Sequence, residues 1–376
     1  MTSTDAAWDE RVEWLEADGE GGFASGTATG IRTRRYHAWL LAAAGAPTRR
    51  FVLVNGCAAW VDTPAGRFAL SSQRYSQGYD GEVVHPDGAA RIVSFTPEPW
   101  PTWVFRLPGG VRVAHELFVR RGTPCVVASW RLLAGEGRVI LSARPLLSGR
   151  DPHALHHENP AFRFAPESRD GLLTWRPYDG VPAVRMATNG AYEHAPEWYR
   201  RFLYTDERAR GLDCVEDLAS PGLVRWSLSS GEAVCLLTSD PPGTDALPAG
   251  APLLLARRLR SAERRRRRGR ARLERAAEDY LVRRGSGLTV VAGYPWFADW
   301  GRDTFVALRG LCLATGRLDD ARAILLEWAG AVSEGMLPNR FPDEGGVPEY
   351  NSVDASLWYV VVVGEWLEAI DRKSVV

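Results

Sequence analysis

Short apolar runs that alternate with polar residues dominate the chain from about Arg11 to Ser239, and Gly, Pro, Asp and Asn separate them. Successive side chains of a strand point to opposite faces of its sheet, so this alternation predicts strands. Strand after strand over this length predicts a large antiparallel β-sandwich rather than a domain of immunoglobulin size. The clearest predicted strands are Ala38–Ala43, Phe51–Val54, Trp103–Leu107, Arg112–Phe118, Val126–Leu132, Val139–Ser142 and Val234–Leu237.

The pattern changes after a break rich in Pro and Gly between Pro241 and Gly250. Leu253–Arg284 then predicts one long helix, which contains the basic run Arg264–Arg268. A nucleic-acid surface would carry aromatic residues among the basic ones, and this run has none, so we interpret it as the solvated face of a helix that links two domains. The acidic residues expected to pair with it are Glu263, Glu274, Glu278 and Asp279.

Apolar residues follow a helical period in the last part of the chain. A first helix is expected over Asp303–Ala314, with Gly316 suited to its C-terminal end. A second is expected over Asp319–Gly335, and a third begins around Ser352 or Asp354. Helices joined by loops in this way predict the opening of an α-helical hairpin array. The sequence thus divides into a β-sandwich domain at 1–245, an arginine-rich helical linker at 246–285 and an incomplete helical domain at 286–376.

Composition and charge exclude several classes of protein. Apolar residues make up 45% of the chain and charged residues 24%, values that are typical of globular proteins. The 46 basic and 46 acidic residues balance, so no overall field draws the protein to nucleic acid or to an anionic membrane. Residues 1–13 are polar and acidic, with no basic or apolar region, so we expect no secretory signal there. No apolar stretch approaches the roughly 20 residues that cross a bilayer. Because the five cysteines are scattered without CxxC spacing, we expect free thiols and a cytoplasmic protein.

A candidate sugar site lies in the segment Trp296–Thr304. Arg302 and Asp303 stand side by side at a predicted helix start, just after Trp300. A carboxylate accepts hydrogen bonds from vicinal sugar hydroxyls, a guanidinium donates to them, and an indole covers the apolar face of the ring. The alternative interpretation is that Asp303 is only a first-turn charge favoured by the helix dipole.

A second polar segment, Pro338–Glu344 with Glu349–Asp354, occupies the loop before the third predicted helix. Loops at one end of a helical hairpin array converge, so we expect this segment to face the first one. The chain also contains 15 tryptophans, many of them beside polar residues, which suits the stacking of sugar rings.

Two other motifs do not support a function. Gly19–Ala24 matches a dinucleotide fingerprint, but no long strand precedes it and Ser25–Gly30 cannot open a helix. The histidines of His153–Glu158 lack the HExxH spacing of a zinc site, so we interpret them as hydrogen-bonded loop residues. Nothing in the sequence indicates a cofactor or a metal.

Several longer motifs resemble those of archaeal and bacterial glycogen-debranching enzymes. The motifs similar to the N-terminal domain of that family are Glu13–Leu15, Gly21–Thr27, Thr33–His37, His153–Asn159 and Glu216–Gly222. Those similar to its amylo-alpha-1,6-glucosidase domain are Ala292–Thr304, Met336–Phe341 and Tyr350–Trp358. The resemblance extends to about Ile370.

The resemblance implies a β-sandwich followed by an (α/α)6 toroid that hydrolyses α-1,6-linked glucosyl stubs of glycogen or another α-glucan. It implies that Arg302 and Asp303 hold the terminal glucose. The other residues expected to line the same pocket are Trp300, Asn339, Arg340, Tyr350, Asn351 and Asp354. The resemblance also implies hydrolysis with inversion, which requires a carboxylic acid and a carboxylate about 6.5–9.5 Å apart. The resemblance places both in later helical loops, beyond Val376, so we expect this chain to be an inactive fragment.

Two alternatives stay open. The chain could be a non-catalytic glycan-binding module built on the sandwich, in which case residues 1–250 alone should bind glycogen. It could also belong to a toroid-type disaccharide phosphorylase, in which case turnover should depend on phosphate.

Overall fold

The computed structural model describes residues 9–78, 81–239, 251–342 and 347–374. The described chain forms two compact units. The sandwich unit comprises residues 9–16, 23–42 and 51–268, and the helical unit comprises residues 17–22, 43–50 and 269–374. The break predicted between Pro241 and Gly250, with the boundary at 245, lies outside the described residues.

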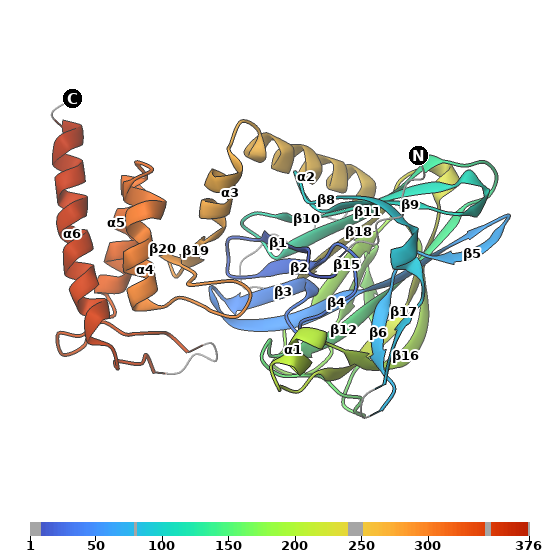
Figure 1. Ribbon diagram of the computed structural model, residues 1–376, viewed down its shortest axis with the longest axis horizontal. Helices are drawn as coiled ribbons and strands as arrows, with labels where there is room; N and C mark the ends of the chain where they lie inside the picture. The colour runs from blue at the N-terminus through green and yellow to red at the C-terminus, as the bar shows by residue number, and fades with distance from the viewer. Residues whose placement is uncertain (1–8, 79–80, 240–250, 343–346, 375–376) are drawn as a thin grey trace. The chain divides into compact units, whose positions relative to one another are not determined.

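Two large sheets make up the sandwich unit (Figure 1). The strands of the first are β1 (Glu13–Ala17), β2 (Phe23–Thr27), β3 (Ala38–Gly45), β4 (Thr48–Thr63), β5 (Gly66–Ala69), β6 (Gln73–Ser76), β7 (Glu82–His85), β12 (Ile140–Arg150), β16 (Ala191–Leu203) and β17 (Val215–Ser227). Those of the second are β8 (Ile92–Thr96), β9 (Thr102–Arg106), β10 (Arg112–Arg120), β11 (Cys125–Ala134), β13 (Glu167–Arg169), β14 (Leu172–Trp175), β15 (Val184–Thr188) and β18 (Ala233–Ser239). One short helix, α1 (Thr205–Ala209), lies between β16 and β17.

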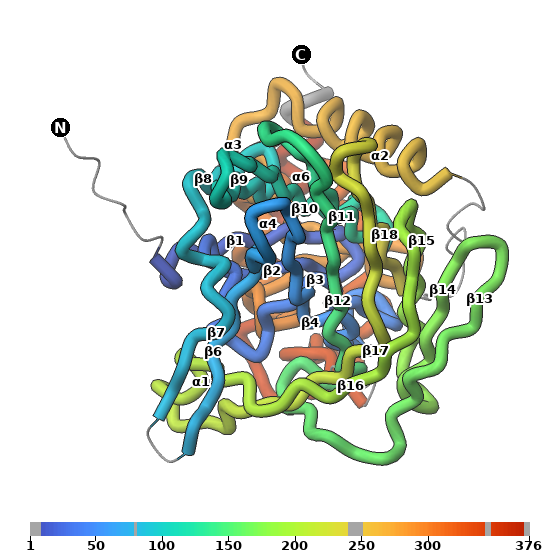
Figure 2. Tube along the Cα trace, turned by 90° about the vertical axis from the view of Figure 1, so that its right-hand side faces the viewer, coloured from blue at the N-terminus to red at the C-terminus, as the bar shows by residue number. Residues whose placement is uncertain are grey.

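Neighbouring strands in each sheet are often distant in sequence. The order of the first sheet is β1-β2-β3-β4-β12-β17-β16-β6-β7 with β5 on β4, and that of the second is β13-β14-β15-β18-β11-β10-β9-β8. Figure 2 shows β11, β18 and β15 side by side in the second sheet. The pairs β10–β11, β11–β18 and β12–β17 are antiparallel, which confirms the prediction of antiparallel sheets over this part of the chain.

The central strands of the second sheet bury both of their faces. In β10, Leu117 and Val119 belong to the main core, which residues of both sheets form. The alternate residue Phe118 instead packs with Ala256 and Leu259 of the helix α2 (Pro252–Arg267). Strand alternation therefore gives the central strands two apolar faces, because α2 covers one of them.

The long helix predicted over Leu253–Arg284 is wrong in two respects. The helix α2 ends at Arg267, and after Gly269, whose φ is +76°, a second helix α3 (Arg272–Asp279) begins. Leu281–Arg284 is a strand, β19, which pairs with β20 (Gly287–Val290) across a turn at Gly285. Glycine reaches such positive φ values without a steric penalty, so these positions interrupt an otherwise helical composition.

The helix α2 is not a free linker, although its outer face, which includes Arg258, Arg264 and Arg265, is exposed as the sequence predicts. Arg267 forms an ion pair with Glu16 at 2.6 Å, and its guanidinium lies 5.5 Å from the ring of Trp100. Arg260 donates to Ser129 Oγ at 2.8 Å and to the carboxylate of Glu232. Arg260 thus fixes the helix to the sheet that it covers, and Arg267 fixes it to β1 of the first sheet. The helix α2 belongs to the sandwich unit.

The helical unit continues with α4 (Gly301–Leu308), a π-helical turn at Arg309–Leu313, α5 (Leu318–Ala329) and α6 (Val353–Ser374). Figure 1 shows α4, α5 and α6 beside one another. The three predicted helices are present, although α5 ends near Gly330 rather than Gly335. Their shared core includes Phe305, Ile324, Trp328 and Val362. No helix within the described ranges has both the length and the apolar character needed to span a membrane.

Candidate functional site

The candidate sugar site is built on the first turn of α4. Trp300 is extended, with φ −122° and ψ 134°, and the helix begins at the next residue. The amide of Gly301 donates to the carbonyl oxygen of Asn339 at 2.7 Å. A Cβ atom at Gly301 would lie 2.5 Å from the carbonyl oxygen of Pro338, so only glycine permits this close approach. The helix start is therefore held against the loop before α6.

Arg302 and Asp303 line an open groove of about 520 Å³ in the helical unit. Both residues are exposed. The other lining residues are mainly apolar, and include Tyr280, Val291 and Leu311. A groove with one charged edge and an apolar wall offers both kinds of contact that a sugar ring uses.

The loop before α6 is joined to Trp300 through Arg340. The main chains of Arg340 and Trp300 form an antiparallel bridge, and so do those of Arg340 and Glu349. The Arg340 guanidinium donates to both carboxylate oxygens of Glu349, at 2.9 and 2.6 Å, and lies 5.6 Å from the Trp300 ring. The hydrogen bond from Arg340 lowers the pKa of Glu349 below its ordinary value.

A second link joins Arg302 to the start of α6. Its Nη1 donates to Asp354 Oδ2 at 3.1 Å, and Ser352 donates to the other oxygen of the same carboxylate. The Ser352 hydrogen bond, with a smaller effect of Arg302, lowers the pKa of Asp354. Arg302 therefore spans from the groove to the second polar segment.

The structure separates some of the residues that the sequence groups together. Trp300, Arg302, Asn339, Arg340 and Asp354 are connected by the contacts above, but of these only Arg302 lines the groove with Asp303. The Tyr350 hydroxyl donates to the carbonyl oxygen of Ala331 at 2.8 Å, so it ties the loop to the end of α5. Asn351 is exposed and lies outside the groove.

The sequence did not indicate some residues that support the candidate site, because their role depends on contacts between distant parts of the chain. Asp299 is fully buried, pairs with Arg284 at 2.6 Å and accepts from Thr289 Oγ1 at 3.2 Å. Trp328 Nε1 donates to the same Thr289 hydroxyl at 3.1 Å. Burial raises the pKa of Asp299, and the Arg284 charge opposes that rise. This network fixes Asp299, the residue before Trp300. The sequence did not reveal it, because Arg284 was predicted to lie in a helix.

The tryptophan segment has a further support within the helical unit. Arg50 is buried, and its guanidinium donates to the carbonyl oxygen of Trp296 at 2.8 Å and to that of Phe297 at 3.4 Å. Arg283 pairs with Glu20 at 2.7 Å, and its amide donates to the Gly19 carbonyl oxygen at 3.0 Å. The glycine-rich segment thus acts as a structural contact of this unit.

The histidine loop is hydrogen-bonded as the sequence predicts. His156 Nδ1 donates to the carbonyl oxygen of Asp217 at 2.9 Å, and its Nε2 contacts the Tyr178 hydroxyl at 2.6 Å. Burial lowers the pKa of His156. Across the described ranges, no group of three or more His, Cys, Asp or Glu side chains is arranged to hold a metal ion.

Comparison with known families covers nearly the whole chain. Residues 12–235 match the family model described as glycogen debranching enzyme N terminal. Residues 275–376 match the model described as amylo-alpha-1,6-glucosidase. The order of the two matches is that of the strand-rich and helix-rich parts of the chain, which defines a two-part carbohydrate-enzyme architecture. The chain belongs to the glycogen-debranching enzyme family.

Individual relatives are more distant. A glycogen debranching enzyme of Saccharomyces cerevisiae is 38% identical over 84 residues, which cover 21% of this chain and 5% of that protein. A bacterial glucoamylase, solved in complex with acarbose, shares 12% identity, with a TM-score of 0.42 over 98% of this chain and 58% of its own. The chain therefore corresponds to only part of each relative's length.

Proposed function

We propose that this chain contributes the glucose-holding part of an α-1,6-glucosidase that removes branch points from glycogen or a related α-glucan by inversion. The observation that supports this most directly is the pair Arg302 and Asp303, which line an open groove at the start of α4. That pair lies in the segment matched to amylo-alpha-1,6-glucosidase. The same proposal places these helices at the beginning of an (α/α)6 toroid.

The chemistry of the groove fits sugar binding better than sugar cleavage. The Asp303 carboxylate can accept hydrogen bonds from two adjacent hydroxyls, and Arg302 can donate to their oxygens. Asp354 holds the Arg302 guanidinium from the other side, so the arginine is oriented before a sugar arrives. Trp300 precedes this pair in the chain, but its ring lies against the Arg340 guanidinium and does not line the groove.

Hydrolysis with inversion needs two carboxyl groups, one to protonate the leaving oxygen and one to activate water. Among the described residues that line the groove, Asp303 is the only one with a carboxyl group. The proposed acid and base must therefore come from other segments that close over the groove. We accordingly propose that this chain alone binds glucose units weakly and does not release glucose.

Two measurements test the proposal. The first is glucose release from isomaltose and from limit dextrin by this chain, which we expect to be absent. The second is binding of isomaltose by this chain and by Asp303→Asn, which we expect to weaken at least tenfold because one charged acceptor is lost.

Asp319→Asn is the matched control, because Asp319 is an exposed first-turn acid of α5 that lies outside the groove. Isomaltose binding should be unchanged in this variant. Equal isomaltose binding by wild type and Asp303→Asn would show that the groove does not bind the sugar. Robust glucose release would show that this chain needs no further segments for hydrolysis.

A further inference from the structure

Among the described residues, three arginines are buried: Arg32, Arg50 and Arg150. Arg150 pairs with Glu216, and Arg50 donates to two carbonyl oxygens of the helical unit. Arg32 is 5% exposed, yet Nε, Nη1 and Nη2 of its guanidinium have no hydrogen-bond partner among the described residues. Burying a charge without a partner is costly, so this guanidinium calls for a complement.

Neighbouring groups do not supply that complement. The Arg32 guanidinium lies 4.8 Å from the ring of Phe202 and 5.9 Å from that of Tyr204. Aromatic rings stabilise the face of a guanidinium but leave the N–H groups at its edge unsatisfied.

The buried acid of this region is already saturated. Glu216 accepts from the Arg150 guanidinium, the Tyr204 hydroxyl, the His156 amide and Asn55 Nδ2. The single negative charge of Glu216 balances the positive charge of Arg150. The positive charge of Arg32 is therefore left over.

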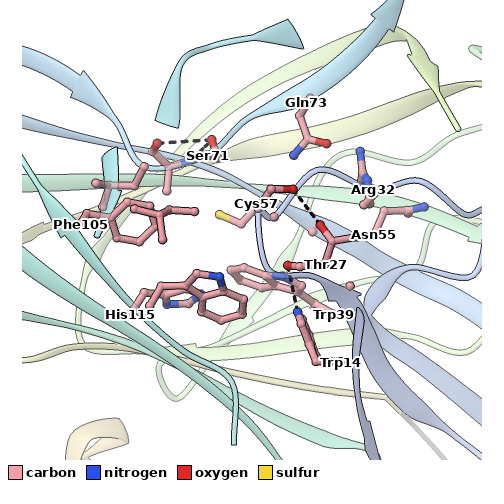
Figure 3. Close-up of a pocket in the computed structure, with 18 of the residues that line it drawn as sticks. Trp14, Thr27, Arg32, Trp39, Asn55, Cys57, Ser71, Gln73, Phe105 and His115 are labelled. Atoms are coloured by element: carbon pink, nitrogen blue, oxygen red, sulfur yellow. Dashed lines mark hydrogen bonds between the residues drawn. The ribbon is translucent and has the colours of Figure 1, made fainter. Parts of the chain in front are cut away.

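Arg32 lines a cavity of about 70 Å³ inside the sandwich unit (Figure 3). A buried water requires roughly 10–15 Å³ of such cavity volume and occupies about 30 Å³ in the liquid. The cavity therefore has room for a ligand about as large as five waters, or about 150 Å³. This volume is too small for a glucan chain and suits a small molecule.

The cavity has a polar side and an aromatic side. Its polar groups include Thr27, Asn55, Ser71 and Gln73, and Asn55 Oδ1 is buried without a partner among the described residues. Its aromatic walls include Trp39, Trp103 and Trp130, which contact the imidazole of His115. No Asp or Glu lines the cavity among the described residues.

The other titratable groups at the cavity are neutral. Burial lowers the pKa of His115 to about 4 and raises that of the Cys57 thiol well above its ordinary value. Arg32 is then the one charge among the described lining residues, and it makes the cavity attractive to an anion.

We propose that this cavity binds a small oxyanion, supplied by a phosphate or a carboxylate group, on the Arg32 guanidinium. The planar guanidinium can donate two parallel hydrogen bonds to either group. A hydroxyl on the same ligand would donate to Asn55 Oδ1, and an apolar body would contact the indoles. This site is separate from the groove at α4, so the anion-binding proposal does not depend on the proposed sugar function.

Thermal unfolding of the whole chain tests the site, with inorganic phosphate or malonate as the probe and chloride at equal ionic strength as the reference. A ligand that binds only the folded state raises the midpoint by an amount that grows with its concentration, roughly 5–10 °C at a hundredfold excess over Kd. We expect such a rise with at least one probe. The probe with the lower Kd identifies whether a phosphate or a carboxylate is preferred.

Arg32→Met should abolish the dependence on the probe. Arg169→Met is the control, since the Arg169 side chain is 93% exposed, and it should respond as the wild type does. The proposal is overturned if phosphate and malonate act no differently from chloride, or if Arg32→Met retains the full response.

Gly56→Ala keeps the test decisive if Arg32→Met does not fold. A Cβ atom at Gly56, which also lines the cavity, would lie 3.4 Å from Arg32 Nη1, an ordinary van der Waals contact. The variant should fold and cover one side of that nitrogen, so we expect the Kd for the probe to rise about tenfold, as the loss of one hydrogen bond implies. An unchanged Kd would place the anion elsewhere and overturn the proposal.

Discussion

The two units of this chain bury their apolar residues in different ways. In the sandwich unit, β10 is buried at every residue from Val113 to Val119, because the main core lies on one face and α2 on the other. In the helical unit, α6 buries Ala355 and Val362 but leaves Val353, Leu357 and Val360 more than 60% exposed. Both faces of β10 are therefore covered, whereas one face of α6 remains apolar and exposed.

The difference extends to the charged residues. The sandwich unit contains a fully buried ion pair, Arg150 with Glu216, which several polar groups complete. The candidate site of the helical unit contains exposed pairs, such as Arg302 with Asp354, although a largely buried pair of Arg284 with Asp299 supports it. Removing one partner of a buried pair is strongly destabilising, whereas exposed pairs contribute little to stability and remain available to a ligand. The exposed pair of Arg302 with Asp354 is thus accessible to the proposed sugar, whereas the pair of Arg150 with Glu216 is not.

The largest expected effect is that of Glu216→Ala. It leaves the Arg150 guanidinium buried without its carboxylate, which should lower the free energy of unfolding of the sandwich unit by about 3–5 kcal/mol. Urea unfolding followed by tryptophan fluorescence measures it. Glu193→Ala is the control, because its pair with Arg225 is half exposed and should be worth less than about 1 kcal/mol. Equal losses in the two variants would contradict the contrast between buried and exposed pairs.

Two adjacent leucines of α5 offer a matched test in the helical unit. Leu325 is 4% exposed and belongs to the core, whereas Leu326 is 56% exposed. Leu325→Ala should cost about 2–5 kcal/mol and unfold the helical unit first, while Leu326→Ala should stay within about 0.5 kcal/mol. Limited proteolysis should then release the helical segments and leave the sandwich unit intact. Simultaneous loss of both units would show that the two do not unfold separately.

The strands were predictable because their signal is local. Each predicted strand, such as Ala38–Ala43 or Val126–Leu132, lies within or overlaps an observed one, since alternation depends only on neighbouring residues. The order of strands was not predictable, because β12 pairs with β4 and β17 through contacts between distant parts of the chain. Leu281–Arg284 was misassigned because arginine-rich composition favours a helix, while the turn at Gly285 and pairing with β20 favour a strand.

The candidate site was predictable to a similar extent. The adjacency of Arg302 and Asp303 is visible in the sequence, and so is the helix that begins there. The pairing of Arg302 with Asp354 depends on how α6 packs beside α4. The hydrogen bond from the Tyr350 hydroxyl to the Ala331 carbonyl oxygen depends on how the loop before α6 lies against the end of α5. The sequence did not indicate Arg32 as a candidate binding residue, because a buried arginine is recognised only when the surrounding packing is known.

A pH dependence sharpens the contrast in the sandwich unit. Burial among Trp39, Trp103 and Trp130 lowers the pKa of His115 to about 4, against about 6.5 in the unfolded chain. Below pH 6.5 the unfolded chain binds a proton that the folded chain does not, so stability is complete above that pH and falls as the pH drops toward 4. The loss between pH 7 and pH 5 should be about 2 kcal/mol.

The variant His115→Phe isolates that contribution. His37 and His156 also have lowered pKa values, so wild type and variant should both lose stability in acid, but the variant should lose about 2 kcal/mol less. Urea midpoints at pH 7 and pH 5 give the comparison. Parallel losses in the two proteins would mean that His115 is protonated in the folded state.

The smallest expected effect concerns α6, where two valines lie two residues apart. Val360 is 69% exposed, and Val362 is fully buried. Val360→Gln should change the free energy of unfolding by less than about 0.5 kcal/mol and reduce self-association, measured by sedimentation velocity over a range of concentrations. Val362→Gln should cost several times more, because it places an amide in the core. If Val360→Gln proved as costly as Val362→Gln, the outer face of α6 would be covered in solution, and the contrast between a closed sandwich unit and an open helical unit would no longer hold.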